Sequence, residues 1–466
     1  MCNHKSIGLS FAGVLLVQLV CDCGEALAQP GGGGGGAIAQ GVYVDATGVL
    51  RTVLVTEKGD RLKGLRRQNV ARATGDVAGK AQLRKVSLAR LTKEVKECVE
   101  AGKPIPDELR YLAGITQIQY LFVYPEENDL VIAGPAEGWE LDAAGRVVGT
   151  TSKRPVLRLD DLVVALRVFP PNADPNVIVG CSINQTVEGV RNLNQYLASL
   201  GSSVDRRSIN ASMVQRVRDS LGLQDVEIWG VPGDSRLAAV LVEADYRMKL
   251  IGIGLEEPRV RGLSSYYSLL GPGDGGMNKL QRWWFVPDYE AIEEGDDGNA
   301  FEFRGQRAKL VGADEKLKMS GEVERGETVS ATTKRFAQSF SSHFEELTRA
   351  SPIYAEMQNA FDWVVFAALI QQRKLISGVA PELSYFLRVD GGYEPEVFQT
   401  PKQAESVANA KWIGTKLAIP VGGGVVMEPV KVLNRKSDKS TKDPKLTEHR
   451  QAARTTNKTT SRWWMD

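Results

Sequence analysis

The sequence predicts an α+β fold in which strand-turn-strand units pack with amphipathic helices. Short runs rich in β-branched and aromatic residues flank turn-forming segments, and longer segments carry apolar residues at helical spacing. The chain has 466 residues, 42% hydrophobic and 25% charged, a composition typical of globular proteins. Its 58 Lys and Arg against 57 Asp and Glu give a formal net charge of +1, which excludes a wholly basic nucleic-acid-binding protein.

Two short segments have the pattern of a β-hairpin tip. In residues 44–50 and 141–147, an Asp opens the turn through its side chain and a following Gly supplies a positive φ. Residues 118–133 are expected to form two strands joined by a turn. A similar pattern over residues 226–242 suggests two related units, with its second strand at 237–242.

Apolar spacing predicts the helices. They are expected over 83–101, 183–200, 213–221, 246–251 and 353–369.

The best internal boundary is the proline-rich stretch 169–175. It separates an expected N-terminal α+β unit over 41–172 from an expected C-terminal α+β unit over 173–433. The second unit is expected to end in two strands on either side of the glycines at 422–424.

Residues 1–28 have the features of a cleaved signal peptide. A lysine precedes the apolar residues 7–20, which are too few to span a bilayer, and residues 26–28 form a small-residue cleavage site. We therefore expect an exported protein, periplasmic or extracellular, with no transmembrane anchor in the mature chain. A lipid-anchored cysteine is the alternative, although neither Cys21 nor Cys23 follows the usual small residue. A glycine-rich leader over 29–40 comes next.

Cleavage after residue 28 leaves two cysteines, Cys98 and Cys181. In an oxidising compartment they permit one disulfide. The alternative is that both are small buried side chains, because Cys98 shares an apolar helix face with Leu91 and Val95. Two cysteines and His343, the one histidine outside the signal peptide and tail, are too few for a zinc site. We expect no metal and no cofactor.

Residues 434–466 differ in composition from the rest of the chain. Nine Lys and Arg stand against four Asp and Glu, and aliphatic residues are nearly absent, which predicts a disordered basic tail. The tail ends in Arg462-Trp463-Trp464-Met465-Asp466. It is interpreted either as solvated chain or as an arm that docks on a cell-envelope polymer or protein partner. Nucleic acid is not an expected partner.

Most catalytic motifs are missing from the sequence. No G-x-S-x-G elbow accompanies His343, and residues 75–81 are one residue short of a phosphate-binding loop. The sequence does not exclude a catalytic pair of carboxylates, because a glycosidase needs only two acids about 5 to 10 Å apart.

The candidate binding residues form two groups. The first surrounds one turn and one helix start: Asp234, Ser235, Asp245, Arg247 and Lys249. Asp245 and Lys249 are also i,i+4 partners on a helix, which explains them without a function. The second group is Trp283 and Trp284, of which a strand would bury one and expose the other as a platform for a sugar.

Five segments carry a resemblance to a known family. They are 243–254, with the core Ala-Asp-Tyr-Arg-Met-Lys at 244–249, then 261–267, 282–284, 304–306 and 361–370. Together they resemble a family of exported planctomycete proteins known only as a domain of unknown function. The resemblance spans most of residues 100–430. It implies export and the extent of the domain, and it brings no activity.

We therefore expect a non-catalytic binding or scaffolding protein of the bacterial cell envelope. The alternative is a hydrolase that acts on envelope polysaccharide or peptide through acidic residues. An acidic pair in a cleft beside the exposed tryptophan would favour the hydrolase, and a flat surface without convergent polar groups would favour the scaffold.

Overall fold

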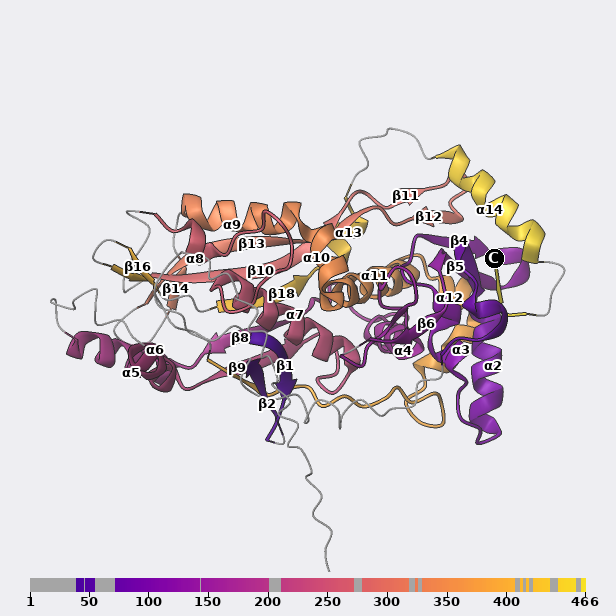
Figure 1. Cartoon of the computed structure of the whole chain (residues 1–466). Helices are drawn as coiled ribbons and strands as arrows, with labels where there is room; N and C mark the ends of the chain where they lie inside the picture. The colour runs from indigo at the N-terminus through magenta and orange to yellow at the C-terminus, as the bar shows by residue number, and fades with distance from the viewer. Residues whose placement is uncertain are drawn as a thin grey trace, which may run out of the picture. The chain divides into compact units, whose positions relative to one another are not determined.

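The computed structural model confirms the α+β fold (Figure 1). It describes residues 39–45, 47–54, 72–142, 144–200, 211–271, 279–317, 323–325, 329–406, 411–413, 416–418, 422–435, 443–457 and 462–466. The expected signal peptide and the leader up to residue 38 lie outside this range. No helix within it is both long enough and apolar enough to cross a membrane.

The larger sheet contains nine strands among the described residues, in the order β1-β2-β15-β9-β8-β18-β10-β13-β14. Its neighbouring strands are antiparallel, except that β15 runs parallel to β2 and β10 runs parallel to β18. The strands are β1 (Ala39–Val44), β2 (Val49–Leu54), β8 (Val179–Gln185), β9 (Leu223–Trp229), β10 (Lys279–Tyr289), β13 (Gly305–Leu317), β14 (Val323–Arg325), β15 (Gln403–Glu405) and β18 (Gly422–Met427).

The smaller sheet contains six described strands, in the antiparallel order β11-β12-β4-β5-β3-β19. They are β3 (Ala81–Ser87), β4 (Tyr120–Tyr124), β5 (Asp129–Ala136), β11 (Glu293–Glu294), β12 (Ala300–Glu302) and β19 (Trp464–Met465). Two further pairs stand apart: β6 (Trp139–Leu141) with β7 (Val147–Gly149), and β16 (Lys411–Ile413) with β17 (Lys416–Ala418).

Helix α11 (Pro352–Gln372) is the central helix of the core. Its residues from Ile353 to Ile370 are all buried, as expected for a helix that is packed on every side. It contacts α4 (Leu159–Val168), α7 (Arg236–Gly252), α10 (Phe344–Ala350), α12 (Leu375–Gly378) and α13 (Pro429–Leu433). The other α-helices of the described residues are α2 (Leu88–Glu100), α3 (Asp107–Arg110), α5 (Val187–Ser199), α6 (Ala211–Leu221), α8 (Tyr266–Leu269), α9 (Ala331–Ser342) and α14 (Pro444–Asn457).

Strand pairs cross the expected boundary between residues 172 and 173. The N-terminal strand β2 pairs with β15 in the larger sheet, and β12 pairs with the N-terminal β4 in the smaller one. Each sheet is therefore built from both halves of the sequence.

The two predicted hairpin tips are confirmed. Gly48 and Gly145 have φ of 80° and 81°, and their amides donate to the carbonyl oxygens of Asp45 and Asp142. Strands β4 and β5 also pair as expected around a turn at Pro125–Glu127. Local turn chemistry was sufficient at these positions.

Other predictions were wrong in part. Residues 83–87 belong to β3, so the helix predicted from 83 begins only at Leu88. The apolar run 237–242 belongs to α7, not to a strand, so the suggested second strand-turn-strand unit does not form. The glycines 422–424 lie inside β18, not between two strands. Short apolar or glycine-rich runs do not distinguish helix, strand and loop until their packing partners are known.

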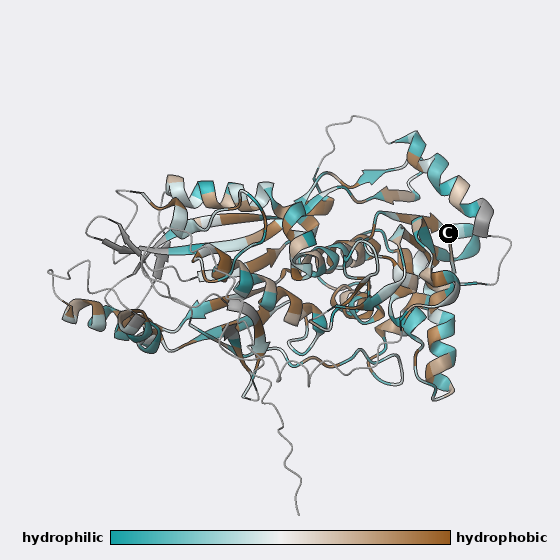
Figure 2. Cartoon of the chain, in the orientation of Figure 1, coloured by the Kyte–Doolittle hydropathy of each residue, from teal (hydrophilic) through white to brown (hydrophobic). Residues whose placement is uncertain are grey.

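Residues 434–466 differ from the expected disordered tail. Helix α14 places Leu446 and Ala453 against Phe122 and Tyr124 of the smaller sheet, and β19 pairs with β3. Figure 2 shows α14 as mostly hydrophilic, which explains why composition alone did not reveal it. The packing surface is supplied by the rest of the chain.

Candidate functional site

Ser235 and Asp234 mark the start of helix α7. The Ser235 hydroxyl accepts from the Ala238 amide at 3.2 Å and donates to the Pro232 carbonyl at 2.7 Å. Asp234 is exposed, and its main-chain carbonyl accepts from the Phe398 amide at 2.7 Å. Both predicted residues therefore have a structural role as the helix cap and its turn.

Asp245 and Lys249 face the larger sheet from α7. The two residues are 0% and 4% exposed, with 3.1 Å between Lys249 Nζ and Asp245 Oδ2. Lys249 also donates to the Ile183 carbonyl at 2.9 Å. Burial raises the pKa of Asp245 and lowers the pKa of Lys249, because it disfavours both charged forms. The pair anchors α7 on β8 and does not lie on the predicted binding surface.

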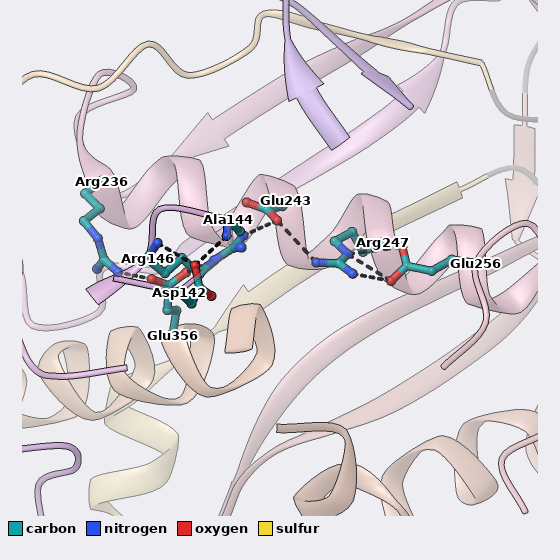
Figure 3. A network of polar contacts seen from close by, with 8 residues as sticks. All are labelled: Asp142, Ala144, Arg146, Arg236, Glu243, Arg247, Glu256 and Glu356. Atoms are coloured by element: carbon teal, nitrogen blue, oxygen red, sulfur yellow. Dashed lines mark hydrogen bonds and ion pairs between the residues drawn. The ribbon is translucent and has the colours of Figure 1, made fainter. Parts of the chain in front are cut away.

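Arg247 lies in a second group of charges, drawn in Figure 3. Its Nε donates to Glu256 Oε1 at 3.0 Å, and its Nη1 lies 3.7 Å from Glu243 Oε1. Glu243 in turn pairs with Arg146 at the tip of the β6–β7 hairpin.

The same network continues to helix α11. Arg146 lies 3.1 Å from Glu356, which also pairs with Arg236 at 2.6 Å, and Arg236 contacts Asp161. Although burial acts in the opposite direction, the guanidinium groups of Arg236 and Arg146 hold the pKa of Glu356 below its usual value. Glu243, Glu256, Glu356 and Asp161 each pair with an arginine, and Asp142 accepts from the main-chain amides of Ala144 and Arg146. Each of these acids therefore has a structural partner.

The two tryptophans lie on opposite faces of β10. Trp283 is fully buried, with its ring 4.8 Å from Phe336 and 5.1 Å from Tyr266, measured between centroids. Trp284 is half-buried on the other face. The two side chains alternate between the faces as expected, but Trp284 is half-buried and not exposed. The alternation separates Trp284 from Asp245 and Lys249.

The face of the larger sheet that carries Trp284 brings together residues from four strands. Cross-strand partners point to the same face. Trp284 pairs with Gly424, Gly424 with Ser182, and Ser182 with Glu227. A neighbouring row contains Trp229, Gly180 and Val426, and a third contains Asp225, Asn184, Gly422 and Arg282. We call these residues of β8, β9, β10 and β18 the indole face.

Glycines let large side chains lie flat on the indole face. A Cβ added at Gly180 would lie 2.9 Å from two atoms of the Trp229 ring, and one at Gly422 would lie 3.0 Å from Arg282 Nε. Arg282 crosses Gly422 and donates to Asn184 Oδ1 at 2.7 Å. Asn184 donates onward to the Ser182 hydroxyl at 2.9 Å. The side chains of Arg282 and Asn184, in the row of residues next to Trp284, are therefore held in place.

The spacing of the indole face suits an extended ligand. Three strand spacings of about 4.8 Å separate β9 from β10, so Trp229 and Trp284 lie roughly 15 Å apart. Asp225 and Glu227 are exposed on the same face of β9, and their Cα atoms lie two residues, or about 7 Å, apart. Two aromatic platforms on one face with polar groups beside them are an arrangement that can hold a chain of sugar rings.

Trp229, Arg282 and Asn184 were not selected from the sequence. The alternation over Asp225-Val226-Glu227-Ile228-Trp229 marks a strand with one polar and aromatic face, which is a signal that could have identified Trp229. The partner strands are 40 or more residues away in the sequence, and their register was not visible.

The remaining candidates do not contribute a site. Cys98 and Cys181 are free thiols, so the proposed disulfide does not form: Cys98 lies on α2, and Cys181 is buried in β8 of the larger sheet. His343 Nδ1 lies 2.8 Å from the Ser339 carbonyl at the end of α9. Within the described ranges, no cluster of three or more His, Cys, Asp or Glu could hold a metal ion.

One protein family matches part of the chain. The model described as "Protein of unknown function (DUF1598)" matches residues 181–266. This segment runs from β8 to the start of α8, so it includes Asn184, Trp229, Asp245 and Lys249 but ends before β10. No match is found among curated proteins or among solved structures. The chain is similar to a family of unknown function over this segment, and the similarity carries no activity.

Proposed function

We propose that the protein is an exported, non-catalytic binding protein of the bacterial cell envelope that holds an envelope polysaccharide on the indole face. The observation that carries this proposal is the pair of half-buried rings, Trp229 and Trp284, on one face, with Arg282 and Asn184 fixed in the row of residues next to Trp284. Sugar rings stack on indoles through their apolar C–H faces and hydrogen-bond at their edges. The signal-peptide pattern and the resemblance to exported planctomycete proteins support the location.

The indole face is favoured over the tail as the partner surface. Trp463 and Trp464 are 8% and 2% exposed, because the end of the chain packs on β3. The proposed arm with a free aromatic tip therefore has its tip on its own chain. The basic residues of α14 include Arg450 and Arg454, which pair with Asp297, Glu126 and Glu127.

The second candidate function is a polysaccharide hydrolase. Its supporting observation is the exposed pair Asp225 and Glu227 beside Trp229. Inverting glycosidases separate their two carboxyl groups by about 6.5 to 9.5 Å, a range that side chains two residues apart on one strand can reach.

The test is binding of the mature protein, residues 29–466, to insoluble peptidoglycan and chitin. We expect saturable binding and quenching of indole fluorescence. The double variant Trp229→Ala/Trp284→Ala should weaken binding about tenfold or more, since the loss of about 1.4 kcal/mol is tenfold in affinity. Tyr196→Ala, a half-buried aromatic residue of α5, is the matched control and should bind normally.

The outcomes separate the hypotheses. Equal binding by the double variant, or no binding to either polymer, would overturn the proposed function. Release of reducing ends that is lost in Asp225→Asn and Glu227→Gln would replace the binding protein with the hydrolase.

A further inference from the structure

A separate cavity of about 380 Å³ lies at the C-terminal end of helix α11. Its walls come from the proline-rich stretch 169–175, from α11 and from the short helices α12 and α13. None of its lining residues belongs to the indole face. Its volume is within the range of about 300 to 1,000 Å³ that is typical of small-molecule sites.

The cavity has an apolar floor and a polar rim. Phe169, Ala368, Ile370 and Ile376 line the floor and are buried. Exposed polar residues at the rim are Asn172, Gln372, Lys374 and Ser377. This division suits a ligand with an apolar body and one polar end.

The walls of the cavity are fixed by Gln371. Its Nε2 donates to the Pro170 carbonyl at 2.9 Å and to the Ala173 carbonyl at 3.2 Å. These two hydrogen bonds tie the proline-rich stretch to the end of α11. The cavity is therefore formed by connected main chain and not by a chance gap between loose side chains.

The charge of the lining is one-sided. Lys374 is its one ionisable residue, and no Asp or Glu lines the cavity. An ammonium group at the rim of an apolar cavity favours an anionic end on the ligand.

The backbone at Lys374 gives an independent reason to expect a role for its side chain. Lys374 has φ 55° and ψ 35°, the left-handed conformation, between the end of α11 and the start of α12. Glycine is the usual residue at this helix-end position, because other residues are strained there. Retaining a lysine at such a position points to a use for its side chain.

We propose that this cavity binds a small anionic amphiphile, with a single acyl or alkyl chain on the apolar floor and its carboxylate at Lys374. The mature protein should bind decanoate in isothermal titration calorimetry with one site per chain. It should bind 1-decanol at least tenfold more weakly, because the alcohol carries no charge. The site is independent of the polysaccharide proposal, so failure of one leaves the other standing.

Lys374→Gly is the decisive variant. It removes the ammonium group and relieves the left-handed strain, so decanoate binding should weaken at least tenfold while the thermal unfolding midpoint stays the same or rises. Lys153→Gly is the matched control, because Lys153 also has a positive φ, 58°, but does not line the cavity. Val430→Trp should block the cavity and abolish binding.

Two results would overturn the proposal. One is the absence of saturable decanoate binding to the mature protein. The other is a Lys374→Gly variant that binds decanoate as tightly as the parent chain does, even if the parent binds it well.

Discussion

Gly423 sets how closely helix α7 approaches the larger sheet. Its hydrogen occupies space that a Cβ would share with Lys249 Cε and Asp245 Oδ1. The buried Asp245–Lys249 pair therefore lies directly on the backbone of β18. Glycine in a strand interior weakens the strand, but here only glycine leaves room for the buried pair to lie this close to the backbone.

We expect Gly423→Ala to destabilise the protein. The added methyl group must displace either buried charge or the strand, and overpacking of this kind costs about 1 to 3 kcal/mol. Urea unfolding followed by circular dichroism measures the change. Gly233→Ala is the control, because a Cβ at Gly233 meets nothing within 4 Å. Equal unfolding free energies for the two variants would contradict the close contact.

At the scale of the element, the C-terminal strand β19 closes the edge of the smaller sheet. The Ser87 amide donates to the Trp463 carbonyl at 2.9 Å. Arg84, fully buried, donates to Asp466 Oδ1 at 2.5 Å, and its Cζ lies 4.5 Å from the centroid of the Trp464 ring. An unpaired edge strand is a template for unwanted pairing, and β19 covers that edge.

Trp464→Ala should open this edge. Trp464 is 2% exposed, and replacing a buried Trp by Ala costs about 3 to 5 kcal/mol. We expect hydrogen exchange at the Ser87 amide to become at least 100-fold faster as local opening becomes easier. The control Arg454→Ala removes half-exposed ion pairs to Glu126 and Glu127 and should change exchange little. Unchanged protection in Trp464→Ala would show that β19 contributes no stability.

Elements with their own local signals were predictable from the sequence. Local sequence is enough to predict the two hairpin tips, because each has an Asp and a Gly at the turn positions. It is also enough for α11, because its apolar residues recur at helical spacing. The run 237–242 does not, because its burial against α11 is what makes it a helix, and α14 is stabilised by a sheet that its own composition does not reveal. At the candidate site, the alternation of Trp283 and Trp284 was predictable from the sequence. The placement of Trp284 and Trp229 on one face of the sheet was not, because it depends on the register of four strands.

At the scale of the whole molecule, the order of the strands in the larger sheet is the feature that could not be predicted from the sequence. The larger sheet joins β1 and β2 near the N-terminus to β18 near residue 425, with β15 inserted between β2 and β9. Such pairs close long loops, and local patterns do not specify them. Both large sheets combine strands from the two sides of the expected boundary between residues 172 and 173, a pairing that local patterns do not predict.

Buried carboxyl groups also act on the stability of the whole molecule, and two of them act in opposite directions. Asp129 accepts from the Ser87 hydroxyl at 2.7 Å and the Ala89 amide at 3.1 Å, and burial raises its pKa despite these bonds. Glu356 is also buried, but its two arginine partners hold its pKa below the usual value. The folded state therefore favours the protonated form of Asp129 and the ionised form of Glu356.

The free energy of unfolding should consequently fall as the pH rises from about 4.3, the unfolded pKa of Glu356, towards the raised folded pKa of Asp129. The contribution of Asp129 is complete below its unfolded pKa of about 3.9 and is lost as the pH rises through its raised folded pKa. The contribution of Glu356 is complete above its unfolded pKa of about 4.3 and is lost only as the pH falls below it, so it stays constant over this range. One proton changes the slope by at most about 1.4 kcal/mol per pH unit. Urea unfolding at each pH measures this slope. Asp129→Asn should make the slope shallower, whereas the exposed control Asp234→Asn should keep it, because other buried carboxyl groups such as Asp245 remain in both variants. A slope identical in all three proteins would show that Asp129 does not contribute to it.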